Sequence, residues 1–200
     1  MAAERRGAWR EFVAAVRADH ATIARYSDRY RGAGRASKYL TADFVQKIGF
    51  QMIVVYRLMR LARAARIPLL PQILSRFIRH LYATDIHWNA SFEPGVMIVH
   101  GMGMCISHGA TVASGAILFQ RITLGEGIDA ATREVGSPRI ERDVHIGPGA
   151  TLLGPITIGA GSKIMAGCTV THSIPAGCLV EAPAPAVRRR GDGPLRAAAS

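Results

Sequence analysis

The feature that most constrains the fold of this 200-residue chain is a six-residue repeat in its second half. Thirteen hexads begin on an apolar residue, and Gly recurs at their second and fourth positions. A short strand and a sharp turn, repeated three times, close one triangular rung of about 18 residues. Chance alternation in an ordinary sheet does not explain thirteen matches in thirteen. The hexads begin at Ile86, Phe92, Ile98, Ile106, Val112, Leu118, Leu124, Ile140, Ile146, Leu152, Ile158, Ile164 and Val170.

These hexads predict a left-handed parallel β-helix, which is an exception to the right-handed crossover rule. The first residue of each hexad is expected to point inward, and the fifth to lie near a corner. The apolar fifth positions include Met102 and Ile128, and Ser162 is the one polar residue among them.

Two interruptions break the repeat. Met104-Cys105 inserts two residues after the hexad that contains His100. The segment from Ala130 to Arg139 lacks the aliphatic position and carries Gly and Pro, so we expect one protruding loop there. Loops on a rigid scaffold commonly carry binding groups.

Before Asp85, apolar residues recur at helical spacing, and Pro68 and Pro71 separate two helices. We therefore expect an α+β chain with a helical N-terminal region (1–84), a β-helix domain (85–187) and a basic, flexible tail (188–200). The helical stripes are Phe44, Ile48, Met52, Val55 and Met59, and then Ile73, Phe77, Ile78 and Leu81.

Charge and composition restrict the function classes. Residues 1–84 hold 16 Lys and Arg against 5 Asp and Glu, so the whole net charge of +11 lies there. This excess suits an acidic ligand, a membrane surface or simply solvated helix faces. Basic residues and aromatics do not interleave as nucleic-acid binding requires, so we expect no nucleic acid.

The compartment is expected to be the cytoplasm. Three cysteines without paired spacing argue against a disulfide framework. The first residues have no apolar core typical of a secretory signal. The stretch Ile48–Leu61 is interrupted by Arg57 and Arg60 and is too short for a membrane span.

Three motifs carry a resemblance to a known family. The chain resembles serine O-acetyltransferase, a hexapeptide-repeat acyltransferase, over about residues 56–187, and most densely from 85 to 169. The motifs are Asp85-Ile86-His87, then His100-Gly101-Met102-Gly103 before the two-residue insertion, and Ile122-Thr123-Leu124-Gly125 before the loop, with Tyr56-Arg57 in the helical part.

The resemblance implies acetyl transfer from acetyl-CoA to a hydroxyl, with His100 as general base and Asp85 orienting it. Imidazole chemistry agrees, because a group with a pKa of about 6.5 can take the proton of an attacking alcohol. A carboxylate on the other ring nitrogen would fix the tautomer and stabilise the imidazolium. No metal is expected.

The family holds acetyl-CoA in a groove between neighbouring subunits, which implies a homotrimer. A helical part of 84 residues is shorter than the family domain that joins two trimers, so we expect a single trimer. Arg188 to Arg190 would either hold nucleotide phosphates or form a solvated tail. The matching donor positions are Gly125, Gly127, Pro148, Gly149, Lys163, Ala166 and Gly167.

The departures from the family lie on the acceptor side. Its Asp-Arg-His-Pro run is replaced by Val135-Gly136-Ser137-Pro138, and Val99 precedes the histidine where aspartate is usual. A polar site that loses such groups changes its choice of acceptor. Serine remains the first acceptor considered, with Arg133, Ser137 and Arg139 as acceptor-binding candidates.

Two alternatives stay open. The chain could acylate a hydroxyl or amine of a sugar or a natural product. It could instead be a non-catalytic or metal-binding β-helix trimer, for which the competing histidines are His87, His108, His145 and His172.

Overall fold

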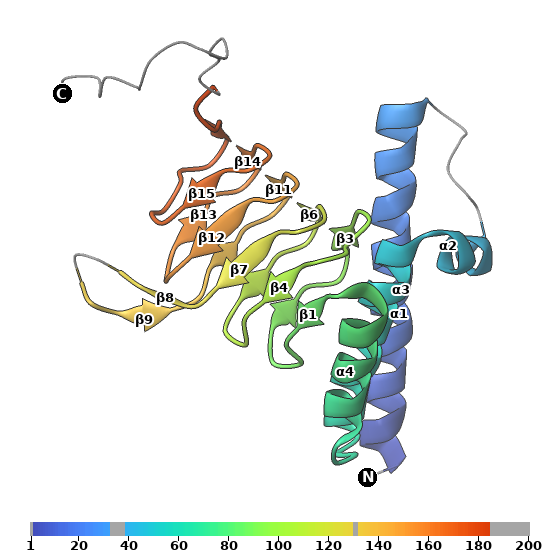
Figure 1. The fold of residues 1–200 in the computed structure, drawn as a ribbon. Helices are drawn as coiled ribbons and strands as arrows, with labels where there is room; N and C mark the ends of the chain where they lie inside the picture. Colours follow the sequence, from blue (N-terminus) through green and yellow to red (C-terminus); the bar gives the residue numbers. More distant parts are fainter. Residues whose placement is uncertain (1, 33–38, 130–131, 185–200) are drawn as a thin grey trace, which may run out of the picture.

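The computed structural model describes residues 2–32, 39–129 and 132–184, in which helices precede a stack of short strands (Figure 1). The helices are α1 (Ala2–Arg31), α2 (Leu40–Gln46), α3 (Ile48–Ala64) and α4 (Leu70–Tyr82). The predicted break is confirmed, because α3 ends before Pro68 and Pro71 lies in the first turn of α4. The tail 188–200 lies outside the described residues.

The strands form three parallel sheets, which the chain visits in the repeating order A, B, C up to β15; before β16, a single bridge from Ile174 to Ile158 stands at the sheet B position. Sheet A contains β1 (Asp85–Ile86), β4 (Cys105–Ile106), β7 (Thr123–Gly125), β12 (Thr151–Leu153) and β15 (Thr169–Val170). Sheet B contains β2 (Ser91–Phe92), β5 (Thr111–Val112), β10 (Arg139–Ile140) and β13 (Thr157–Ile158). Sheet C contains β3 (Met97–Ile98), β6 (Ile117–Leu118), β11 (His145–Ile146), β14 (Lys163–Ile164) and β16 (Leu179–Val180). This order matches the predicted left-handed parallel β-helix.

Three edges follow from that order, and each takes its name from the two sheets that it joins. The chain passes from sheet A to sheet B at the A/B edge, from B to C at the B/C edge, and from C to A at the C/A edge. Strands β8 (Gly127–Ile128) and β9 (Val135–Gly136) belong to none of the three sheets and pair antiparallel with each other (Figure 1).

The interior of the stack is built from the first positions of the hexads. All thirteen are no more than 5% exposed. The polar Ser162 is fully buried but satisfied, because its hydroxyl donates to the Pro175 carbonyl (2.8 Å) and accepts from the Cys178 amide (3.1 Å).

Most of the apolar fifth positions are also buried, but Met102 and Ile128 are 49% and 57% exposed. The two-residue insertion lengthens the turn, so Met104 (1% exposed) fills the interior in place of Met102. Ile128 has left the stack, because it lies in β8.

A buried ion pair fixes the helices to the first rung. Arg57 of α3 donates from Nε and Nη2 to the carboxylate of Asp19 in α1 (2.9 and 3.0 Å) and from Nη1 to the Phe92 carbonyl (2.7 Å). Asp19 Oδ1 also accepts from the amides of Gly95 (2.8 Å) and Val96 (3.1 Å). Since Val96 leads directly into β3, this network also anchors the strand that precedes His100.

The apolar stripe on α4 is only partly covered. Ile78 is fully buried, whereas Ile73, Phe77 and Leu81 are 54–60% exposed. In Figure 1, α4 packs beside β1 on the side of the stack formed by sheet A. No helix among the described residues is long and apolar enough to cross a membrane.

Candidate active site

His100 lies on the C/A edge, in the turn between β3 and β4, and its side chain is exposed. Its φ of +63° is in the left-handed region. That conformation costs a non-glycine residue about 1–2 kcal/mol, so the surrounding structure must hold the turn in place.

The turn is held from beneath by the residues that follow α4. Thr84 Oγ1 donates to the Gly101 carbonyl (2.8 Å), and the Gly103 amide donates to the Tyr82 carbonyl (3.3 Å). Gly101 has a φ of +76°, and a Cβ there would stand 2.5 Å from the Met52 sulfur and 2.6 Å from Ile98 Cγ2, so any other residue would be strained. These contacts fix the backbone of the turn that carries the His100 imidazole.

Asp85 opens sheet A at the same C/A edge, and its amide donates to the Met104 carbonyl (2.8 Å). Its carboxylate accepts a hydrogen bond from Arg79 Nη2 at 2.7 Å, with the two side chains 40% and 51% exposed. The structure therefore brings Asp85 to the edge that carries His100 but pairs its carboxylate with Arg79. The dyad of Asp85 and His100 stays a prediction.

Four predicted donor residues stack along the C/A edge above His100. The strand register aligns Ile98 with Leu118, Ile146 and Ile164, so the turns that follow these strands form one column. The Gly167 amide donates to the Pro148 carbonyl (2.9 Å), which joins two of these turns. The column contains Pro148, Gly149, Ala166 and Gly167.

The backbone conformation of two turns in this column requires glycine. Gly149 and Gly167 have φ values of +71° and +72°, and nothing lies within 4 Å of a Cβ built on either. Both turns are therefore open on their outer side, which lets a ligand approach the backbone closely.

The other predicted donor residues lie elsewhere. Gly125 and Gly127 are near the A/B edge, where a Cβ would meet the Leu153 side chain (2.6 Å) or the Gly154 amide nitrogen (2.9 Å). Packing between rungs thus accounts for both glycines. Lys163 lies in β14 of sheet C, in register with His145 of β11.

The predicted acceptor residues are also separated. Ser137 lies near the A/B edge, and its hydroxyl accepts a hydrogen bond from Ser107 Oγ (2.9 Å). Arg133 belongs to the β8–β9 connection, with a φ of +60°, and Arg139 begins β10 on the face of sheet B. In one chain, Ser137 and His100 are therefore on the two opposite edges of sheet A.

Two of the competing histidines come together at the A/B edge. The His87 and His108 rings are 5.8 Å apart, and His108 Nδ1 lies 3.6 Å from Glu126. Partial burial, and then the charge of His108, lower the pKa of His87, while Asp85 raises it. Among the described residues, no three His, Cys, Asp or Glu side chains converge as metal ligands would.

Sequence reasoning missed Thr84 and Arg79. Arg79 occupies the last turn of the helix six residues before Asp85, but no periodic pattern identifies it as a carboxylate partner. Thr84 is fully buried, and its one signal is its position immediately before Asp85.

Comparisons with known proteins agree with this fold. Residues 137–172 match the family model "Bacterial transferase hexapeptide (six repeats)". Serine acetyltransferase from Synechococcus elongatus is 35% identical over 133 residues, which are 66% of this chain and 53% of that protein. The Bacillus subtilis serine acetyltransferase is 33% identical over 129 residues, which are 64% of this chain and 58% of that protein.

Solved structures show the same likeness. The crystal structure of Neisseria gonorrhoeae serine acetyltransferase in complex with serine aligns with a TM-score of 0.72 and 26% identity, covering 88% of this chain and 68% of that one. The resemblance seen in the motifs is therefore confirmed. The chain spans between half and three fifths of the length of the two curated relatives.

Proposed function

We propose that this chain, similar to serine acetyltransferases through its helices and hexads, transfers the acetyl group of acetyl-CoA to the hydroxyl of serine. One observation carries the proposal. His100 projects outward from a fixed turn on the same edge as the open turns at Gly149 and Gly167. That column offers a thioester a path to an imidazole.

The chemistry needs no covalent enzyme intermediate. An imidazole nitrogen of His100 takes the hydroxyl proton as the acceptor oxygen attacks the thioester carbonyl. The carbon–sulfur bond then breaks, and the proton passes to the CoA thiolate, leaving an O-acetyl ester and free CoA. Asp85 lies at the same edge to balance the imidazolium charge, and Arg79 holds its carboxylate.

The two halves of such a site lie on different edges of one chain, which supports a homotrimer. With sheet A turned toward a threefold axis, the C/A edge of each chain meets the A/B edge of the next. His100 of one copy then faces the protruding loop and Ser137 of its neighbour. Helix α4, which packs beside β1 of sheet A, carries the exposed apolar stripe of Ile73, Phe77 and Leu81, and such a stripe favours a contact with another copy.

A second acceptor class is favoured by the β8–β9 hairpin. Ile128 and Val135 pair across it and are 57% and 63% exposed. An apolar loop beside the acceptor favours a hydroxyl compound less polar or larger than serine. Arg133 and Arg139 remain the cations that would bind an acceptor carboxylate.

Release of free CoA thiol, followed with L-serine and a panel of other hydroxyl acceptors, tests these proposals. We expect acceptor-dependent thiol release that His100→Ala reduces by about 10³-fold or more, with acetyl-CoA binding retained because the side chain points outward. Asp85→Asn should be milder, since the base remains. Near-normal turnover in His100→Ala would remove His100 from the mechanism.

A further inference from the structure

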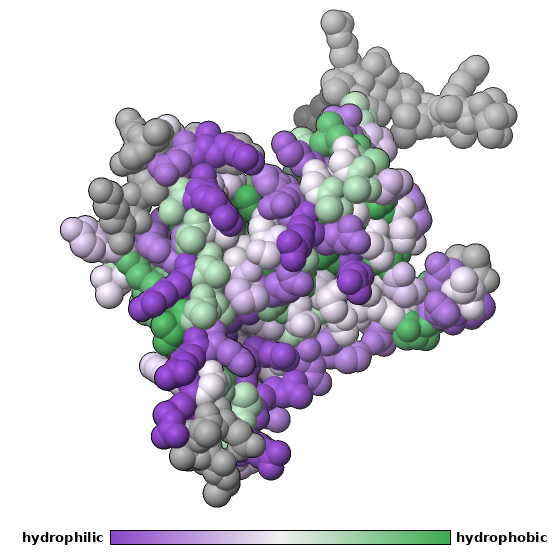
Figure 2. All heavy atoms as spheres, turned by 180° about the vertical axis from the view of Figure 1, so that it is seen from behind, coloured by the Kyte–Doolittle hydropathy of each residue, from purple (hydrophilic) through white to green (hydrophobic). Residues whose placement is uncertain are grey.

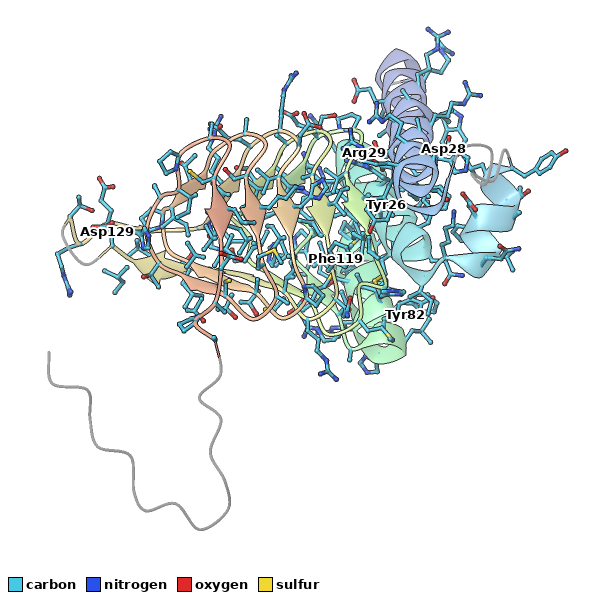
Figure 3. The ribbon with its side chains drawn as sticks, turned by 90° about the horizontal axis from the view of Figure 1, so that it is seen from above. Tyr26, Asp28, Arg29, Tyr82, Phe119 and Asp129 are labelled. Carbon is cyan, nitrogen blue, oxygen red and sulfur yellow. The ribbon has the colours of Figure 1, made fainter. Side chains whose placement is uncertain are left out.

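A groove separate from the proposed active site lies between α1 and the B/C edge. It encloses about 830 Å³. One wall is the stretch of α1 from Thr22 to Arg29, and the other is formed by sheet C and the turns that lead into it. Figure 3 shows Tyr26 and Arg29 on the part of α1 beside the strand stack, and Figure 2 shows hydrophilic residues gathered over this face. The edges that carry His100 and Ser137 are the other two.

Positive charge dominates the lining of this groove. Arg25 and Arg29 come from α1, Arg142 from the B/C edge and Lys163 from β14, against the carboxylates of Asp28 and Asp143. Cations that line a partly enclosed surface attract anions more strongly than scattered ones do. Guanidinium groups also match the oxygens of phosphate and sulfate in bidentate geometry.

Two of these cations, Arg29 on one wall and Lys163 on the other, act on the same side chain, His145. His145 lies half-buried in β11, between Ile117 and Lys163 in the register of sheet C. Burial lowers the pKa of its imidazole, the charges of Lys163 and Arg29 lower it further, and Asp143 opposes them. Helix α1 and strand β14 thus direct positive charge at the same side chain.

We propose that this groove binds a small oxyanion with at least two phosphate or sulfate groups, held by Arg29 and Arg142 with Lys163. Arg29 and Arg142 belong to different elements, so the ligand would link α1 to the strand stack. If these cations were solvated and acted independently, they would not bind one anion together, and the titration would not saturate.

Calorimetric titration of the full chain with inorganic pyrophosphate at low salt tests the proposal. We expect saturable binding, one pyrophosphate per chain, and stronger than that of single phosphate or sulfate ions at matched ionic strength. Arg29→Gln and Arg142→Gln should each weaken it about tenfold. The matched control is Arg10→Gln on the same helix, about 18 Å before the groove begins. An equal loss in Arg10→Gln, or no saturation, would overturn the proposal.

The imidazole of His145 provides a second readout that needs no variant. Bound pyrophosphate offsets the charges of Lys163 and Arg29, so NMR should show the pKa of His145 rising on saturation. An unchanged pKa would place the ligand elsewhere, and displacement by acetyl-CoA would assign the groove to the donor site. Arg29→Gln should keep the acetyl-transfer rate. If the unaltered protein transferred no acetyl group, that result would contradict the proposed function but not the anion site in this groove.

Discussion

Replacing Thr84 by Val tests how far the His100 turn depends on one buried hydroxyl. Thr84 is 0% exposed, and its Oγ1 donates to the Gly101 carbonyl at 2.8 Å. Val keeps the branched shape but leaves that carbonyl without its donor. An unpaired buried polar group costs about 1–3 kcal/mol, so we expect the free energy of unfolding to fall by about that amount.

The same change should reach the chemistry through the backbone. His100 keeps its left-handed conformation because Gly101 is held, and a relaxed turn displaces the imidazole from the acceptor. We expect kcat for acetyl transfer to fall about tenfold, which corresponds to about 1.4 kcal/mol, with KM for acetyl-CoA little changed. Steady-state thiol-release kinetics and urea unfolding measure the two effects.

Thr111 offers a matched control on sheet B. Its Oγ1 is buried and makes no hydrogen bond to any residue that the structure describes. Thr111→Val therefore removes the same atom without breaking a contact, and stability should stay constant or rise. If both Val variants lost equal stability, or if Thr84→Val kept full kcat, the role given to the Thr84 hydroxyl would be wrong.

Three further predictions concern the buried pair, the exposed helix face and pH. Arg57→Met leaves the buried carboxylate of Asp19 without its partner and should lower the free energy of unfolding in urea by about 3–5 kcal/mol. Phe77→Asp should cost a single chain little, because that ring is 54% exposed, but should dissociate the proposed trimer in light scattering; an unchanged mass would exclude α4 from the interface. The pKa of the His145 imidazole is depressed in the folded state, so its contribution to the free energy of unfolding is fully present above about pH 6.5 and is lost as the pH falls through the folded-state pKa. Lys163→Met should raise that pKa in NMR titrations and reduce the loss of stability.

The interior of the stack was predictable because its physics repeats every six residues. Each first position, from Ile86 to Val170, faces the same apolar environment, so one rule covers all thirteen. The fifth positions are less regular, because the two-residue insertion lengthens the turn, so Met104 is buried where Met102 is exposed. A local pattern also identified the apolar stripe of α4, but it did not identify the surface that packs against that stripe. Amphipathic spacing is the same whether a helix packs within its own chain or against another copy.

Pairings between elements were the part that the hexads did not determine. Whether Asp85 meets His100 or Arg79 depends on the direction in which α4 approaches β1, and that direction is set by a short turn outside the repeat. The phase of the repeat does determine the edge to which a turn belongs. His100 follows a sheet C strand, whereas Ser137 follows the hairpin that interrupts the passage from sheet A to sheet B. Two residues on the opposite edges of one sheet do not share a substrate within a chain, so a joint role for them requires a second copy.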